Sequence, residues 1–178
     1  MIMPPDNVVV RKATPTDRDD ILALVLAAFS GVDHDGHEEV RIVTSTWELR
    51  STALDLELAA VMDGVVVGHV LAAWGDLSGR AVAAVAPLAV SPSHQHRGIG
   101  TALMTELLRR AEAARLPLLV LLGDPGFYGR FRFEPSRPLG ICYRAVGEGN
   151  PHFLVRRFGG YDESYRGDFT YCWESGHD

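Results

Sequence analysis

Residues 95–101 combine side chains and spacing that can bind a phosphate group. Gly98 and Gly100 have no side chains, so the backbone at these positions can approach an anion closely. An amphipathic helical pattern starts directly after them, and the start of a helix presents free N–H groups and a partial positive charge. Gln95 and Arg97 provide further donors. On spacing alone, an anion site and a plain turn before a helix are equally well supported.

Two common nucleotide-binding motifs do not fit this segment. The dinucleotide fingerprint would need a third glycine at position 103, where the chain has Leu103. The P-loop pattern Gly-x-x-x-x-Gly-Lys-Ser/Thr does not occur in the sequence. A phosphorylated ligand at residues 95–101 would therefore need another binding mode.

The segments around this loop predict a mixed protein of the α/β (α+β) class. Helical spacing predicts an amphipathic helix that runs to Phe29, with Thr16 as its N-cap and Asp19 as the acidic partner of a capping box. The other expected helices cover residues 38–52, 98–115 and 125–128. The expected strands cover residues 8–11, 56–62, 65–74, 81–90, 118–122, 141–145, 153–157 and 169–173.

Turn residues and one proline refine this arrangement. Asp63-Gly64 predicts a two-residue hairpin, and residues 75–79 predict a further turn. The run 81–90 is almost entirely apolar, which indicates a strand buried on both faces. Pro87 lies inside that run and has no N–H to donate to a neighbouring strand. We therefore expect the sheet pairing to be interrupted near Pro87.

The pattern Gln95-x-x-Gly98-x-Gly100, directly after a strand that ends at Val90, resembles the acetyl-CoA-binding motif of the GCN5-related N-acetyltransferase (GNAT) superfamily. A second segment, residues 122–135, resembles the Tyr-x-x-x-Gly-Phe segment of the same superfamily. It is more similar still to a subfamily of predicted acetyltransferases that carries Gly-Asp-Pro-x-Tyr-Tyr there. The two segments occur in the order and at the separation that the superfamily shows.

The resemblance implies a fold and a domain organisation. It runs from Val8 to about Pro135 in the order of elements and continues more faintly to Tyr171. It implies a mixed, mostly antiparallel central sheet that is flanked by helices and splayed near Pro87. Residues 1–178 would form one acyl-CoA N-acyltransferase domain, with a more divergent part from about residue 136.

The resemblance also implies how coenzyme A would bind. Backbone amides of residues 95–101 would hold the pyrophosphate, and the strand before them would pair with the pantetheine arm. A backbone N–H near Leu88 would stabilise the oxyanion that develops during transfer. Acetyl-CoA is thus the implied co-substrate, and no metal ion is implied. The implied cofactor-binding residues are Leu88, Ala89, Val90, Gln95, His96, Arg97, Gly98, Ile99, Gly100 and Thr101.

Tyr128 matches the position where many members of the superfamily place a tyrosine that protonates the departing thiolate. Its neighbours Phe127, Phe131 and Phe133 are by themselves more typical of an aromatic cluster that packs a short helix. The resemblance favours the catalytic role. Arg132 stands where the superfamily usually has glycine, which predicts an altered turn after the short helix.

No motif identifies the general base that would remove a proton from the amine. Acidic residues on central strands are common candidates, but the run 81–90 contains none. Five residues elsewhere qualify by type alone: His69, Glu57, Asp76, Glu48 and His152. His69, on an apolar strand, is more typical of a structural histidine.

Two further groups of polar residues are more typical of solvated surface than of a site. His34 and His37 form a His-x-x-His pair in a polar loop, but a third ligand is missing, so a metal site is not expected. The same loop can equally line the acceptor site, as the region between the first two helices does in many relatives. Three basic residues near the carboxyl end form the second group, Arg156, Arg157 and Arg166.

The composition excludes several classes of protein. Hydrophobic residues make up 47% and charged residues 22%, as in an ordinary globular domain. The net charge of -6 argues against nucleic-acid or membrane binding through an overall basic field. Cys142 and Cys172 form no CxxC pair, and no apolar run approaches the ~20 residues that span a bilayer. The amino terminus lacks the pattern of a signal peptide, so a cytoplasmic protein is expected.

These observations lead to one main hypothesis and two alternatives. The main hypothesis is an N-acetyltransferase that moves an acetyl group from acetyl-CoA to a primary amine of a small molecule or a peptide in a ternary complex. One alternative is a non-catalytic acyl-CoA-binding sensor or regulatory domain, and the other is an unrelated phosphate-binding fold. Edges near the carboxyl end are compatible with a homodimer, but nothing in the sequence specifies one.

Overall fold

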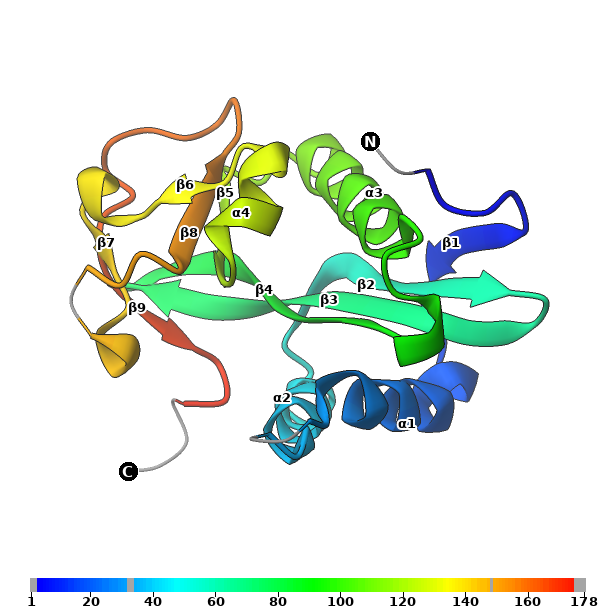
Figure 1. Cartoon of the computed structure of the whole chain (residues 1–178). Coiled ribbons are helices and arrows are strands. Elements are labelled where there is room, and N and C mark those ends of the chain that lie inside the picture. Colours follow the sequence, from blue (N-terminus) through cyan, green and yellow to red (C-terminus); the bar gives the residue numbers. More distant parts are fainter. Residues whose placement is uncertain (1–2, 32–33, 148, 175–178) are drawn as a thin grey trace.

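The computed structural model of the chain describes residues 3–31, 34–147 and 149–174. A central sheet separates two groups of helices (Figure 1): α3 (Ile99–Ala113) covers one face, and α1 (Arg18–Phe29) and α2 (His37–Glu48) cover the other. This is the mixed fold that the sequence predicts. None of the helices in the described ranges is long and apolar enough to cross a membrane.

The sheet contains nine strands within the described residues. From β1 to β4 each strand pairs with the next in antiparallel orientation, and β5 then pairs with β4 in parallel. The strands β8 and β6 follow with antiparallel pairing, and β9 pairs with the last residues of β3. The sheet is therefore mostly antiparallel, as expected. The strands are β1 (Val8–Lys12), β2 (Thr52–Met62), β3 (Val65–Leu77), β4 (Arg80–Val90), β5 (Leu118–Leu122), β6 (Glu134–Pro135), β7 (Ile141–Cys142), β8 (Phe153–Arg157) and β9 (Gly167–Tyr171).

Helix α3 packs closely against the middle of the sheet. It buries Leu103, Met104 and Leu107 completely. A Cβ on Gly68 of β3 would lie only 2.9 Å from Leu103 Cδ1, so the glycine allows the helix to approach the strand. This contact fixes the start of α3 beside the end of β4.

Helices α1 and α2 cover the opposite face. Ile21 and Val25 of α1 and Val43 of α2 have no exposed surface and pack in one cluster with Leu71 and Ala89 of the sheet. The apolar face that the sequence predicts for the first helix therefore forms part of the core. The loop between the two helices contains His34, which lies within the described residues.

The sheet pairing is interrupted at Pro87, as predicted. The register between β3 and β4 shifts between Val70 and Ala72, so that Ala86 and Pro87 of β4 lie opposite the single residue Leu71. This is a β-bulge, and a bulge accommodates a residue that lacks an N–H donor.

The sheet also opens between β4 and β5. These parallel strands pair only at Ala83 with Leu119 and at Ala84 with Val120. Beyond Ala84 the two strands run on without pairing to each other. The splay that was expected near Pro87 therefore lies on the β5 side of β4, next to the bulge.

The first helical turn begins earlier than the sequence predicts. The expected N-cap pair of Thr16 and Asp19 is wrong, because the capping box is formed by Thr14 and Asp17. The Asp17 carboxylate accepts a hydrogen bond from the Thr14 N–H at 2.7 Å. Pro15 is suited to the first helical position, so a 3-10 turn, Pro15–Asp17, precedes α1.

Two element ends also differ from expectation. The second helix was expected to reach residue 52 but ends at Glu48, because Arg50 adopts a left-handed conformation with φ 50°. The expected turn at 75–79 is present but shorter, at Ser78 and Gly79, because β3 continues to Leu77. Gly75 serves packing instead: a Cβ there would lie 2.6 Å from Phe169 Cζ of β9.

The carboxyl-terminal third contains the other differences. The expected strand 141–145 is reduced to Ile141–Cys142, and a 3-10 turn, Arg144–Val146, follows it. The short strand β6 was not predicted. The strands 153–157 and 169–173 are present, the second shifted two residues toward the amino end as Gly167–Tyr171.

Candidate functional site

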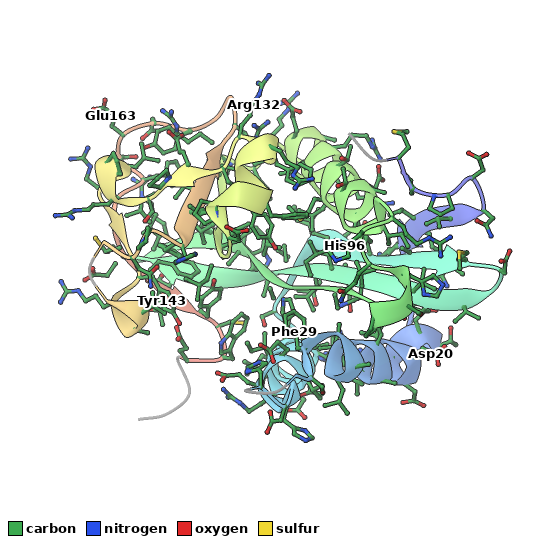
Figure 2. The ribbon with its side chains drawn as sticks, in the orientation of Figure 1. Asp20, Phe29, His96, Arg132, Tyr143 and Glu163 are labelled. Carbon is green, nitrogen blue, oxygen red and sulfur yellow. The ribbon has the colours of Figure 1, made fainter. Side chains whose placement is uncertain are left out.

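The loop between β4 and α3 has the backbone geometry of an anion site. His96 and Gly98 have positive φ angles of 59° and 79°, and Gly98 is the N-cap of α3. The Gln95 side chain donates to the Val90 carbonyl at 3.2 Å and so ties the loop to the end of β4. Figure 2 labels His96 on this loop.

The N–H groups of this loop are available to a ligand. The first hydrogen bond of the helix runs from the Ala102 N–H to the Gly98 carbonyl at 3.0 Å. Within the described part of the chain, the N–H groups of residues 95–101 have no acceptor in the backbone or in a side chain. Seven consecutive donors at the positive end of a 15-residue helix can bind a pyrophosphate.

A cavity of about 390 Å³ lies against this loop, and we call it the loop cavity. Gly100 keeps it open, because a side chain there would be directed toward Phe127 Cζ, 3.7 Å from its Cβ. Eight of the ten expected cofactor-binding residues line the loop cavity, whereas Ala89 and Arg97 do not. Ala89 is buried on the α1 face. The lining residues are Leu88, Val90, His94, Gln95, His96, Gly98, Ile99, Gly100, Thr101, Phe127 and Arg130.

Arg130 adds a cation to the loop cavity that the sequence analysis missed. Its guanidinium lies over the Phe127 ring, 4.6 Å from the ring centre, and its Nε donates to the Phe127 carbonyl at 3.0 Å. Its only signal in the sequence is its position two residues after Tyr128. The contact with Phe127 brings it to the helix start of α3.

A second cavity of about 730 Å³ lies where β4 and β5 separate, and we call it the large cavity. Leu88 lines both cavities, while the consecutive residues Phe127 and Tyr128 line one each. The two cavities therefore adjoin at the end of β4 and at α4 (Pro125–Tyr128). Figure 2 labels Phe29 and Tyr143, which line the large cavity from opposite parts of the fold. The lining residues are Phe29, Glu38, Glu39, Arg41, Ile42, Val85, Ala86, Pro87, Leu88, Leu121, Leu122, Gly123, Tyr128, Tyr143, Val146, Tyr171, Trp173 and Glu174.

Tyr128 both packs and faces a cavity. Its ring contacts Phe127 edge-on, with 4.9 Å between ring centres, and Phe133, with 5.8 Å. Burial raises the pKa of Tyr128 to about 12, so its phenol stays protonated at neutral pH. The Asp124 side chain caps α4 by accepting from the Gly126 N–H at 2.9 Å, as the sequence predicts for a helix opened by Asp-Pro.

Arg132 adopts the conformation that glycine prefers. Its φ is 62° and its ψ is 28°, directly after the 3-10 turn Gly129–Phe131. The turn after the short helix is therefore left-handed although the residue has a side chain. Where the resemblance predicts glycine, this chain has Arg132, and its Cβ makes the left-handed backbone conformation strained.

The large cavity is also lined by aromatic residues from the carboxyl end. Tyr171 and Trp173 stack with 4.4 Å between ring centres and 17° between planes. The Tyr143 hydroxyl donates to Glu174 Oε1, and the Tyr171 N–H donates to Glu174 Oε2 at 2.9 Å. Burial and the Glu174 carboxylate raise the pKa of Tyr143 above its ordinary range. The sequence analysis did not assign these residues.

The five residues considered as general base do not line either cavity. His69 is fully buried, and its Nε2 lies 3.0 Å from Glu57 Oε1, which also accepts from Trp47 Nε1 at 2.9 Å. Asp76 accepts from the Gly79 N–H in a turn, and His152 Nδ1 lies 3.2 Å from the Gly123 carbonyl. Glu48 is exposed at the end of α2. The carboxylates in the large cavity are Glu38, Glu39 and Glu174.

The other polar residues from the sequence have ordinary surroundings. His34 Nε2 lies 2.8 Å from Glu39 Oε1, and this carboxylate raises the pKa of His34. The described residues contain no group of three metal-ligating side chains, at His37 or elsewhere. Arg157 pairs with Glu134 at 2.6 Å, and Arg156 and Arg166 each donate to a backbone carbonyl outside the two cavities.

Comparison with protein families and curated proteins gives a consistent result. The model of the Acetyltransferase (GNAT) family matches residues 19–128. The uncharacterized N-acetyltransferase YhbS of Escherichia coli (strain K12) is 32% identical over 129 residues, which cover 70% of this chain and 72% of YhbS. The uncharacterized N-acetyltransferase YjhQ of the same strain is 30% identical over 102 residues, and the match spans only 56% of the length of YjhQ.

Solved structures extend the similarity beyond residue 128. The structure of Escherichia coli YhbS in complex with CoA has a TM-score of 0.85 at 26% identity, covering 99% of this chain and 96% of that one. A GNAT family acetyltransferase from Brucella melitensis, in complex with acetyl-CoA, has a TM-score of 0.76 at 29% identity, covering 92% and 95%.

Proposed function

This chain belongs to the GNAT family of acetyltransferases, and from that premise we propose that it transfers an acetyl group from acetyl-CoA to a primary amine of a small molecule or a peptide. The observation that carries the proposal is the row of free N–H groups at residues 95–101, beside the unpaired end of β4. The CoA and acetyl-CoA complexes of the two similar structures support the class of cofactor.

The cofactor would occupy the loop cavity and the gap between β4 and β5. The N–H groups of residues 95–101 hold its pyrophosphate, and Arg130 adds a positive charge beside them. The pantetheine arm runs along the backbone of residues 88–90 and ends at the large cavity. Ala89 takes part through its backbone alone, because its side chain is buried on the α1 face.

The two cavities adjoin near Leu88, and this is where the cofactor and the amine would meet. The amine enters the large cavity and meets the acetyl thioester, which the cofactor supplies, near Leu88. A backbone N–H near Leu88 stabilises the oxyanion. Tyr128 lines the same cavity and holds its proton firmly, since its pKa is raised to about 12. The amine would lose a proton to water and attack the thioester carbonyl in its neutral form, and the C–S bond would then break. Tyr128 would donate its proton to the departing thiolate and regain one from the nitrogen of the new amide.

Titration calorimetry with acetyl-CoA tests the cofactor site. Gly100→Glu places a carboxylate in the loop cavity without forcing a positive φ, whereas a substitution at Gly98 would strain the backbone. We expect the parent to bind acetyl-CoA and the Gly100→Glu variant to lose binding. Gly159→Glu is the matched control, because it adds the same charge where a Cβ meets nothing within 4 Å. It should bind as the parent does.

Release of CoA in the presence of amines distinguishes an acetyltransferase from a non-catalytic sensor domain. An enzyme releases CoA with at least one primary amine in a panel. A sensor domain binds acetyl-CoA as tightly but releases none. A folded parent that does not bind acetyl-CoA would contradict both functions.

A further inference from the structure

The large cavity contains a carboxylate, Glu174, whose hydrogen-bond partners among the described residues are neutral. Glu174 accepts hydrogen bonds from the Tyr143 hydroxyl and the Tyr171 N–H. Among the described residues, no Lys, Arg or His nitrogen lies within 4.0 Å of Glu174. A partly buried carboxylate without a charged partner favours a cationic ligand, because the two opposite charges would form an ion pair.

Aromatic rings surround this carboxylate. Tyr143 is perpendicular to Tyr171, with 5.1 Å between ring centres and 85° between planes, and Trp173 stacks on Tyr171. Aromatic faces attract ammonium groups, and they also pack flat apolar bodies. This part of the cavity therefore suits a ligand that has both features.

Two further glutamates line the large cavity. Glu38 and Glu39 come from the first turn of α2, and Glu38 contributes to the raised pKa of Tyr143, after burial and Glu174. Glu38 pairs with Arg41 at 3.6 Å and Glu39 with His34 at 2.8 Å, so that among the described residues only Glu174 of the three has no charged partner. A ligand with its own carboxylate would be repelled here, and a cation would be attracted.

We propose that the acceptor is a small cationic arylalkylamine: a flat apolar body with a primary ammonium group and no carboxylate. This inference rests on the proposed acetyl transfer and names its substrate class. The aromatic body packs against Trp173, which itself stacks on the buried Tyr171, and Glu174 binds the ammonium group as it enters. The volume of about 730 Å³ is sufficient for such a molecule, since ligand cavities commonly measure roughly 300–1,000 Å³.

Matched pairs of amines that differ by one carboxylate test the proposal. The pairs are tryptamine with tryptophan, tyramine with tyrosine, and phenethylamine with phenylalanine. At saturating acetyl-CoA, we expect kcat/KM from CoA release to be at least about 10-fold higher for the amine than for its amino acid. Hexylamine has an apolar chain and one ammonium group but no ring, and its kcat/KM should be lower than that of tryptamine.

A variant without the negative charge of Glu174 tests whether this carboxylate causes the preference for amines over amino acids. Glu174→Gln keeps an acceptor for the Tyr143 hydroxyl but loses the negative charge. It should lower kcat/KM for the amines about 10-fold, and it should reduce the ratio of kcat/KM between each amine and its amino acid. Glu163→Gln removes the same charge on the outer side of the molecule (Figure 2) and should change neither. Circular dichroism and acetyl-CoA binding confirm that both variants are folded.

The outcomes distinguish a failure of the arylalkylamine inference from a failure of the proposed acetyl transfer. Equal kcat/KM within the pairs, or a higher value for hexylamine than for tryptamine, overturns the arylalkylamine inference and leaves acetyl transfer intact. Unchanged pair ratios in Glu174→Gln overturn the role of this carboxylate. No CoA release with any amine, although acetyl-CoA binds, overturns the proposed function and this inference with it.

Discussion

The ring of Tyr128 lies so close to the backbone of Gly123 that a Cβ on Gly123 would be 2.3 Å from Tyr128 Cε2. Two carbon atoms that are not bonded do not approach each other to that distance. The glycine at the end of β5 therefore determines where the tyrosine ring can lie. Because β5 borders the gap beside β4, this contact links the opening of the sheet to the direction of the phenol.

Gly123→Ala should move the ring of Tyr128 without blocking the cofactor. We expect kcat to fall about 10- to 100-fold, because misplacing a proton donor by about 1 Å has effects of this size. The affinity for acetyl-CoA should stay close to that of the parent, since residue 123 does not line the loop cavity. Steady-state kinetics and titration calorimetry measure the two quantities.

The matched control for this change is Gly129→Ala. A Cβ on Gly129 meets nothing within 4 Å, and its φ of -58° suits alanine. Its kcat should equal that of the parent. An unchanged kcat in Gly123→Ala would show that the position of Tyr128 is unimportant for transfer.

Tyr128→Phe should lower kcat about 100-fold at every pH, because a general acid typically contributes about 10²- to 10⁴-fold. Only the protonated phenol can donate. Its pKa in the folded protein is raised by burial to about 12, above the ordinary value of 10.0, so the active form persists as the pH rises past 10. The pH profile of kcat for the parent should therefore show no descending limb from Tyr128 up to about pH 10.5. A limb near pH 10 that vanishes in Tyr128→Phe would contradict this.

Asp17→Asn should destabilise the fold at neutral pH by about 1–3 kcal/mol, since the Asp17 carboxylate accepts charged hydrogen bonds. Arg11 Nη1 and Nη2 donate to it at 2.7 and 2.8 Å, and the Thr14 N–H donates at 2.7 Å. Urea unfolding measures the loss. Asp20→Asn, in the first turn of α1, should cost no more than about 0.5 kcal/mol.

The contribution of Asp17 should depend on pH in a defined direction. The hydrogen bonds from Arg11 hold the pKa of Asp17 well below its usual range. A group whose pKa is lowered by folding stabilises the protein above its unfolded pKa, and that stability is lost as the pH falls. The difference between parent and Asp17→Asn should be constant from pH 7 to about pH 5 and shrink below about pH 4. A constant difference at pH 3 would count against the ion pair.

Arg132→Gly should raise the free energy of unfolding, whereas Arg132→Ala should not relieve the strain. A left-handed φ of 62° costs a residue with a Cβ about 1 kcal/mol relative to glycine. The Arg132 charge also adds to burial in lowering the pKa of Arg156, so both variants remove the same repulsion. Urea unfolding should therefore place glycine about 1 kcal/mol above alanine. Equal stabilities would mean that the turn is not strained.

Features set by local backbone chemistry could be predicted from the sequence. Asp63-Gly64 forms the expected hairpin, with positive φ at both residues, and Asp124 caps the expected short helix. The bulge at Pro87 follows from the missing N–H. The glycines around residue 98 indicated the loop before α3. In each case the residues that decide the conformation are neighbours in the chain.

Other features depended on contacts between distant segments. The length of β3 could not be predicted, because Gly75 is held by Phe169 of β9, almost a hundred positions later in the chain. The candidate bases could not be ranked, because only the fold shows that His69 is buried and hydrogen-bonded to Glu57.

By itself, the sequence determined the superfamily, the order of most elements and the loop that is suited to a phosphate. The tertiary structure alone decided what faces the large cavity. It brings Glu38 of α2 and Glu174 after β9 to one space, and it opens that space by ending the pairing of β4 with β5 at Ala84. The physical reason is that strand pairing and side-chain packing form between segments far apart in the chain. The residue types of one segment do not specify which other segment it will contact.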